Sequence, residues 1–208
     1  MKNSDFENII KASVLISASV ILAYLYFIGA DNIWGLVRAI SAGVTSASIF
    51  VFMYIKFLWK MPLFNKIAKR PFLSGTWQGT LKSDYKFENG DGVPLKDIFL
   101  VIRQDFLRIH IQSFTDKFNA ESYVEAILFE ESKGLKKLVY VYRQGTSDLG
   151  NQRGDEGTSE LNILTNMNPE LEGRYWTNIK TAGELYFKKI SEKHIEKFSQ
   201  GIDLSNKL

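Results

Sequence analysis

Cysteine is absent from the 208-residue sequence, and histidine occurs only twice. The absence of cysteine excludes disulfide bonds, thiolate metal sites and a cysteine nucleophile. The two histidines, His110 and His194, lie far apart in the sequence and show no metal-ligand spacing. The sequence also has no phosphate-binding P-loop and no dinucleotide-binding glycine fingerprint. We therefore expect neither an enzyme nor a metal centre nor a bound cofactor.

Positive charge is concentrated in the N-terminal part of the chain. Residues 1–70 hold eight Lys or Arg and three Asp or Glu, whereas residues 71–208 hold eighteen and twenty. Basic residues beside a bilayer usually set orientation and contact anionic lipid head groups. The overall basic character is thus no argument for binding a DNA or RNA polymer.

Two apolar runs precede residue 60. Ala12–Ala30 contains nineteen residues without a charge, and Ala39–Ile55 contains seventeen, with several hydroxyl side chains. A helix needs about 20 apolar residues to cross the hydrocarbon core of a bilayer. We predict two transmembrane helices, at about 10–30 and 38–57, within a hairpin formed by residues 1–60.

A cleaved signal peptide is the competing interpretation of the first run. It is disfavoured because Asp5 and Glu7 precede the run and a second apolar run follows. Five basic residues follow the second run without an acid among them: Lys56, Lys60, Lys66, Lys69 and Arg70. The positive-inside rule places this flank, a basic linker over residues 61–71, in the cytoplasm. The N-terminus and everything after residue 70 are then cytoplasmic too.

The second run also contains small residues, among them Gly43, Ser46 and Ala47. Small side chains let membrane helices approach closely. They predict either packing within the hairpin or a face for self-assembly, and the sequence does not separate the two.

After residue 71, apolar and polar residues alternate in short runs that are separated by Gly, Asn and Asp, which is the pattern of β-strands. We predict a β domain over residues 72–191 and a C-terminal tail over 192–208. The predicted strands are Leu73–Ser83, Lys96–Gln104, Phe106–Phe114, Asn119–Glu130, Lys136–Arg143, Thr158–Leu164, Glu170–Thr177 and Ala182–Ile190.

Eight closely spaced antiparallel strands without helical crossovers favour a closed up-and-down barrel, with a β-sandwich as the alternative. Such a barrel is filled by side chains or holds one small ligand. Gly75–Thr76–Trp77 is similar to the Gly-x-Trp that opens lipocalin barrels. Glycines at positions 75 and 79 suit a tightly bent strand and leave room for the indole. Trp77 is either a core residue or a surface on which a ligand stacks.

Basic residues within apolar or aromatic runs are the candidates for ligand contacts. Arginine suits phosphate oxygens and aromatic faces suit nucleobases, so a nucleotide ligand needs both kinds of group. The candidate residues are Trp77, Arg103, Arg108, Tyr142, Arg143, Arg174 and Trp176. The alternative for each arginine is a solvated position at a strand end. The glycine-rich segment 144–157 is either a lid over the barrel mouth or a hairpin tip.

The two spans, the basic juncture and two strand motifs resemble one bacterial family. The motifs are Pro71–Gly79 (PFLSGTWQG), which opens the barrel, and Gly183–Lys188 (GELYFK), which closes it. This layout resembles the two-transmembrane, β-strand-rich membrane effectors of bacterial CBASS anti-phage systems, which are associated with CD-NTase synthases.

The resemblance implies that an eight-stranded barrel binds a cyclic dinucleotide made by a partner CD-NTase synthase. Binding would promote homo-oligomerisation through the membrane helices, disruption of the inner membrane and death of the infected cell. It also implies a multi-pass protein of the bacterial inner membrane. Two other functions remain open: a membrane-anchored, lipocalin-like binder of a lipid or apolar molecule, and a structural anchor with a filled barrel.

Overall fold

The computed structural model describes residues 3–29, 31–61, 63–64, 67, 70–86, 90–130, 134–146, 155–164 and 169–207. These residues form two compact units. The helical unit comprises residues 1–72 together with 105–107, and the barrel unit comprises residues 73–104 and 108–208.

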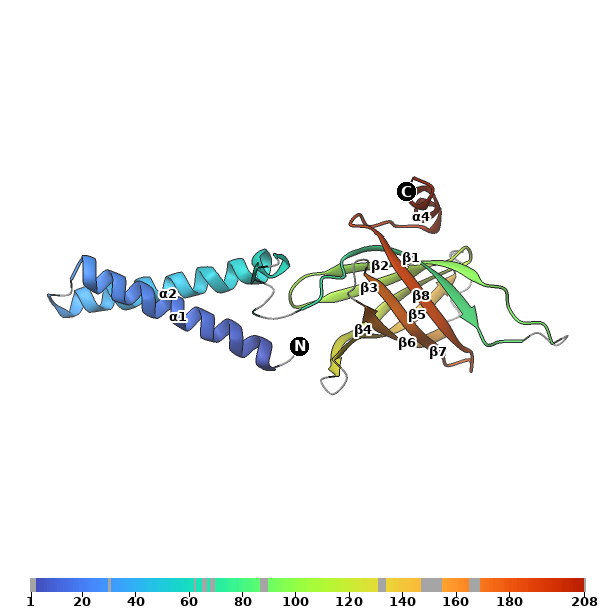
Figure 1. Ribbon diagram of the computed structural model, residues 1–208, viewed down its shortest axis with the longest axis horizontal. Helices are drawn as coiled ribbons and strands as arrows, with labels where there is room; N and C mark the ends of the chain where they lie inside the picture. Colours follow the sequence, from blue (N-terminus) through green and yellow to red (C-terminus); the bar gives the residue numbers. More distant parts are fainter. Residues whose placement is uncertain are drawn as a thin grey trace. The chain divides into compact units, whose positions relative to one another are not determined.

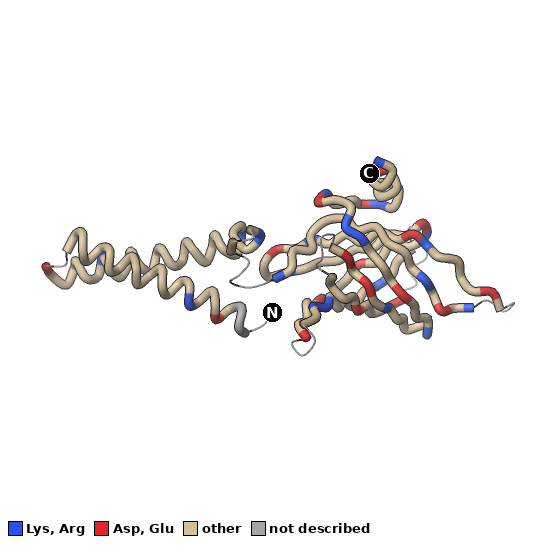
Figure 2. Tube along the Cα trace, viewed as in Figure 1, with Lys and Arg blue, Asp and Glu red and all other residues tan. Residues whose placement is uncertain are grey.

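The helical unit is built on two long helices, α1 (Asn3–Phe27) and α2 (Ile33–Lys56), followed by the short 3-10 helix η1 (Leu58–Lys60) (Figure 1). The segments Phe6–Phe27 and Ile33–Lys56 are long and apolar enough to cross a membrane, and few of their side chains are buried within the protein. Charged residues are sparse along both helices (Figure 2). The two predicted apolar helices are therefore confirmed as candidate membrane spans.

Local chemistry explains where the two helices end and how they pair. Gly29 adopts a positive φ of 80° just after α1, which ends the helix. The Asn32 side chain caps α2 by accepting a hydrogen bond from the Gly35 amide at 2.9 Å. Gly43 of α2 is buried against α1, because a Cβ there would lie 2.6 Å from Cγ1 of Ile21.

An aromatic cluster closes the end of the helical unit. The ring of Phe106 lies 5.5 Å from that of Tyr54 and 5.9 Å from that of Trp59, in edge-on geometry. All three side chains are fully buried. The Arg70 guanidinium donates a hydrogen bond to the Phe106 carbonyl oxygen. Edge-to-face aromatic pairs add about 0.5–1.5 kcal/mol each beyond their burial, so this cluster holds the chain that follows α2 in place.

The barrel unit consists of eight antiparallel strands in sequence order, closed by pairing of the first with the last. The strands are β1 (Gly75–Ser83), β2 (Lys96–Gln104), β3 (Ile109–Phe114), β4 (Phe118–Glu130), β5 (Leu135–Thr146), β6 (Asp155–Leu164), β7 (Glu170–Thr177) and β8 (Ala182–Ser191). The predicted closed barrel is confirmed, and the β-sandwich alternative is wrong. Most strand limits agree within one to three residues, and the predicted third strand starts three residues too early because Phe106 belongs to the aromatic cluster.

The glycines that flank Trp77 accommodate strand β8. Gly75 has a φ of 132°, and a Cβ at Gly75 or Gly79 would overlap the β8 carbonyl oxygens of Ser191 or Tyr186. These glycines were predicted to suit a tight bend and to leave room for the indole, but the atoms nearest to a Cβ at either position belong to β8 or to the residue after it. Glycine is needed here because the two strands approach too closely for any side chain.

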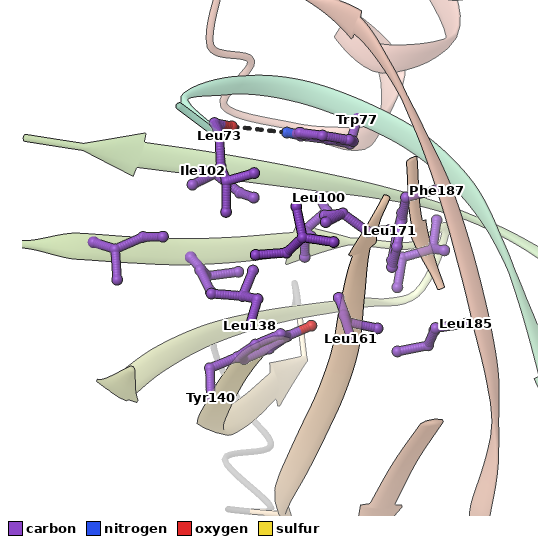
Figure 3. Packing of buried hydrophobic residues seen from close by; sticks show 14 of the residues in the cluster. Leu73, Trp77, Leu100, Ile102, Leu138, Tyr140, Leu161, Leu171, Leu185 and Phe187 are labelled. Carbon is purple, nitrogen blue, oxygen red and sulfur yellow. Dashed lines mark hydrogen bonds between the residues drawn. The ribbon is translucent and has the colours of Figure 1, made fainter. Parts of the chain in front are cut away.

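The hydrophobic core fills one end of the barrel. Trp77 belongs to one cluster of inward side chains to which all the strands of the barrel contribute, and its indole N–H donates a hydrogen bond to the Leu73 carbonyl oxygen at 2.9 Å (Figure 3). Leu100, Leu138 and Leu161 are fully buried in the same cluster. Burial of such a side chain contributes about 1.5–3 kcal/mol, so this end carries much of the stability of the barrel.

The C-terminal tail covers part of the outer wall. Helix α4 (Phe198–Ser205) lies over β1 and β2, where Phe198 packs edge-on against Phe99 at 5.4 Å. Gly201 allows this approach, because a Cβ there would lie 2.5 Å from the Phe99 ring. The tail thus buries outward apolar side chains of β2 that solvent would otherwise contact.

Candidate functional site

A chamber occupies the end of the barrel opposite Trp77. It is a cavity of about 280 Å³ at the end of the barrel where β1, β3, β5 and β7 end and β2, β4, β6 and β8 begin. Leu81, Ile98 and Leu185 line it on the side of the hydrophobic core. The barrel is therefore packed at one end and open at the other, as expected for an eight-stranded barrel that holds one small ligand.

Hydroxyl groups dominate the chamber lining. Half of the twenty described lining residues are Ser, Thr or Tyr, and only Lys96 and Asp155 are charged. Lys96 is the first residue of β2, which places it at the rim of the mouth. The chamber thus offers many neutral hydrogen-bonding groups in its interior, and one cation and one carboxylate at its edge.

Three tyrosines form the largest part of this polar surface. The rings of Tyr140 and Tyr142 lie 5.9 Å apart on β5, and Tyr175 enters from β7. Burial raises the pKa of Tyr140 to about 12, an effect that the neighbouring Ser159 hydroxyl partly opposes. Burial also raises the pKa values of Tyr142 and Tyr175. All three phenols are therefore neutral at physiological pH and act as hydrogen-bond donors or acceptors.

Two glycines keep the chamber open. A Cβ at Gly157 would overlap the end of the Tyr142 ring, and a Cβ at Gly183 would lie 2.6 Å from Cε1 of Tyr175. Each glycine sits on the inner face opposite its tyrosine, as the register pairs Tyr142 with Gly157 and Tyr175 with Gly183. The two rings can therefore lie along the wall and leave the lumen free.

Of the ligand-contact residues predicted from sequence, Tyr142 lines the chamber. Trp77 is fully buried in the core at the other end of the barrel. Arg108 is exposed just before β3. Arg174 and Trp176 lie on the outer face of β7, since they alternate with the inward Tyr175. The structure therefore does not bring these five residues together.

Arg103 and Arg143 both line an open groove of about 1190 Å³ on the outer wall. Arg143 is bound to Glu156 at 2.8 Å and covers the Tyr123 ring, and Arg103 donates a hydrogen bond to Gln112. Three carboxylates, including Glu121 and Glu196, line the same groove. The three carboxylates outnumber the two arginines, which makes the groove a poor site for a phosphate group.

Sequence reasoning missed Lys96, Tyr140, Ser159 and Tyr175 as site residues. The alternation in Tyr140–Arg143 already indicated that the two tyrosines share one face and Arg143 the other. The structure shows that the tyrosine face is the inner one. The choice of Arg143 as a ligand contact therefore fell on a side chain of the outer face. The proposed lid lies in segment 144–157, of which residues 147–154 are outside the described part of the chain.

Within the helical unit, the three residues predicted for self-assembly all lie on α2. Gly43 is buried against α1, whereas Ser46 and Ala47 are partly exposed.

The two histidines of the barrel unit lie in separate places: His110 lies 3.0 Å from Glu121, and His194 lies 3.1 Å from the Ser74 hydroxyl. Among the described residues, no group of His, Asp and Glu could hold a metal ion.

Comparison with known proteins adds three similarities. A sequence model of the family described as "Cap15, cyclic dinucleotide receptor domain" matches residues 68–189, which is nearly the whole barrel. The CD-NTase-associated protein 15 of Staphylococcus schleiferi is 29% identical over 174 residues, which cover 83% of this chain and 91% of that protein. The protein of the same name from Escherichia albertii is 25% identical over 171 residues, which cover 80% and 82%.

Proposed function

Because this chain belongs to the Cap15 cyclic dinucleotide receptor family, we propose that it is a membrane effector of a bacterial CBASS anti-phage system. The family is one of receptors rather than enzymes. In this proposal a cyclic dinucleotide from a partner CD-NTase synthase is the activating ligand.

The observation that carries the proposal is the half-open barrel. A cyclic dinucleotide combines two aromatic bases with two anionic phosphates. The chamber supplies aromatic rings from Tyr140, Tyr142 and Tyr175, and Lys96 is the cation at its rim. Stacking on aromatic side chains contributes about 1–3 kcal/mol per base, and a lysine at the edge attracts phosphate as a point charge.

The largely uncharged lining also suits the second candidate, a tethered binder of a lipid or apolar molecule. Calorimetry on the full-length protein in nanodiscs separates the two, with cyclic dinucleotides compared against fatty acids. We expect heat of binding with a cyclic dinucleotide and none with fatty acids. Binding of fatty acids alone would eliminate the receptor function and favour the second candidate.

The helical unit supports an anchor in the bacterial inner membrane. Both helices are apolar over a span-length segment, and five basic residues follow the second one. The positive-inside rule places that flank and the barrel in the cytoplasm, where a second messenger is made. Protease added to intact spheroplasts should leave the barrel undigested, and digestion beyond residue 71 would contradict this orientation.

The output in this proposal is ligand-driven self-assembly and membrane disruption. A ligand can drive assembly only by binding the assembled state more tightly than the single chain. Confinement to a membrane raises the effective concentration of protomers, which reduces the coupling energy required. Since Gly43 already contacts Ile21 within the hairpin, the partly exposed Ser46 and Ala47 are the more accessible assembly positions.

Cells that express the full-length protein test this output through entry of a membrane-impermeant dye. We expect entry when an active synthase for the ligand is co-expressed, and no entry with a synthase that lacks activity. An intact membrane despite ligand binding in nanodiscs would refute membrane disruption and leave the receptor function standing.

A further inference from the structure

The chamber wall contains a layer of three hydroxyl-bearing residues below its rim. Tyr140 of β5, Ser159 of β6 and Tyr175 of β7 are consecutive partners in the register of these strands. All three face the lumen and line the chamber. Their exposed fractions are 4%, 1% and 7%, so the hydroxyl layer lies well inside the barrel.

The Ser159 hydroxyl has no hydrogen-bond partner of normal geometry, although it lies beside Tyr140. Buried polar atoms in folded proteins are nearly always hydrogen-bonded, because leaving one unpaired costs stability. This hydroxyl borders a cavity, and the backbone groups of the surrounding wall are hydrogen-bonded between neighbouring strands. A ligand group that enters the cavity can therefore donate to or accept from this hydroxyl without breaking a strand hydrogen bond.

The size of the chamber limits what reaches this layer. At about 280 Å³ it is at the lower end of the range of about 300–1,000 Å³ that encloses a whole drug-sized ligand. The volume of a cyclic dinucleotide exceeds the volume of the chamber, so only a part of the ligand enters it. The phosphates are excluded from the depth of the chamber, because Lys96 lies at the rim and the hydroxyl layer is neutral.

We propose that one base of the cyclic dinucleotide enters the barrel and that Tyr140, Ser159 and Tyr175 determine which base is accepted. This inference rests on the receptor function proposed above. The three hydroxyls hydrogen-bond the polar edge of the inserted base, while the phosphates and the second base stay at the mouth. A site built to hydrogen-bond its ligand discriminates strongly, because the wrong edge leaves buried groups unpaired.

The test uses full-length protein in nanodiscs and calorimetric titration with cyclic dinucleotides that carry uracil, guanine or adenine. The variants are Ser159→Ala, Tyr140→Phe and Tyr175→Phe. The matched control is Tyr186→Phe, which removes a hydroxyl from the outer wall of β8. We expect each chamber variant to weaken binding of the preferred ligand about tenfold and to reduce its advantage over the others. The control should bind as the unmodified protein does.

Thermal melting of the ligand-free proteins separates recognition from structure. We expect Ser159→Ala to melt at nearly the same temperature, because it removes neither a strand hydrogen bond nor a large core side chain. Unchanged affinities, or an equal loss for all ligands of the panel, would overturn the assignment of base selection to this layer while leaving the receptor function intact. Failure of the unmodified protein to bind any of the panel would overturn the receptor function itself.

Discussion

Gly157→Ala is the substitution that tests the chamber most directly. The methyl group would overlap Cζ and Oη of Tyr142, the far end of a side chain that can rotate, and would lie 3.0 Å from the Trp176 carbonyl oxygen. We expect the Tyr142 ring to leave the wall and turn into the lumen, because that movement relieves the overlap at the lowest cost.

The magnitude follows from the size of the space. A tyrosine ring turned into a cavity of about 280 Å³ occupies room that a ligand base needs. Loss of one stacked base costs about 1–3 kcal/mol, which corresponds to a weakening of roughly fivefold to 150-fold. The fold itself should lose no more than about 1–3 kcal/mol, the usual cost of overpacking, since the displaced ring has space to enter.

A double-mutant cycle measured by calorimetry supplies the assay. Tyr142→Ala removes the group that the new methyl displaces, so Gly157→Ala in that background should have little further effect on affinity. Gly145→Ala is the matched control, because a Cβ at Gly145 would meet nothing within 4 Å. Its affinity for the ligand should be unchanged.

Two results would refute this reasoning. Full affinity in Gly157→Ala would show that the ligand does not use the lumen beside Tyr142. An equal loss of affinity in the presence and absence of the Tyr142 ring would show that the substitution acts by another route, such as a shift of β6.

Three further predictions concern the rim, the phenols and the core. Lys96→Gln removes the cation at the rim, so it should weaken binding of the cyclic dinucleotide and make that binding less dependent on salt concentration. Titrations at low and high ionic strength measure both effects. The unfolded chain releases the Tyr140 proton near pH 10 and the folded barrel releases it near 12. Stability should therefore be retained below pH 10 and fall by about 3 kcal/mol between pH 10 and 12, and chemical denaturation of Tyr140→Phe should lack this component. Leu161→Ala removes a fully buried core side chain and should lower the free energy of unfolding by about 2–5 kcal/mol in the same assay.

The fold was largely predictable because its determinants are local. Two charge-free runs of helical length predict the apolar helices, and period-two alternation broken by turn residues predicts the strands. The exception near Phe106 has a non-local cause: its side chain packs with Tyr54 and Trp59, about fifty residues earlier in the sequence. A strand pattern does not reveal a partner of that kind.

The site was less predictable, because alternation divides a strand into two faces without saying which one is inside. Outward residues of this barrel are often apolar, as Phe99 and Val101 are beneath the C-terminal tail. A basic residue within an apolar run therefore does not mark the inner face, and Arg103 and Arg143 lie outside. Ser159 gave no sequence signal at all, since its significance comes from its position in the chamber wall between Tyr140 and Tyr175.

The division of the barrel into a packed end and an open end explains how one small domain can be both stable and receptive. Trp77, Leu100 and Leu161 fill the packed end, where each large-to-small change costs stability. The open end contributes less packing and exposes hydroxyl groups instead. Substitutions in the chamber should therefore change affinity much more than stability, whereas substitutions around Trp77 should do the reverse. A single set of variants that moved both quantities in proportion would show that the two ends are one cooperative site, and the chamber would then be a packing defect rather than a receptor.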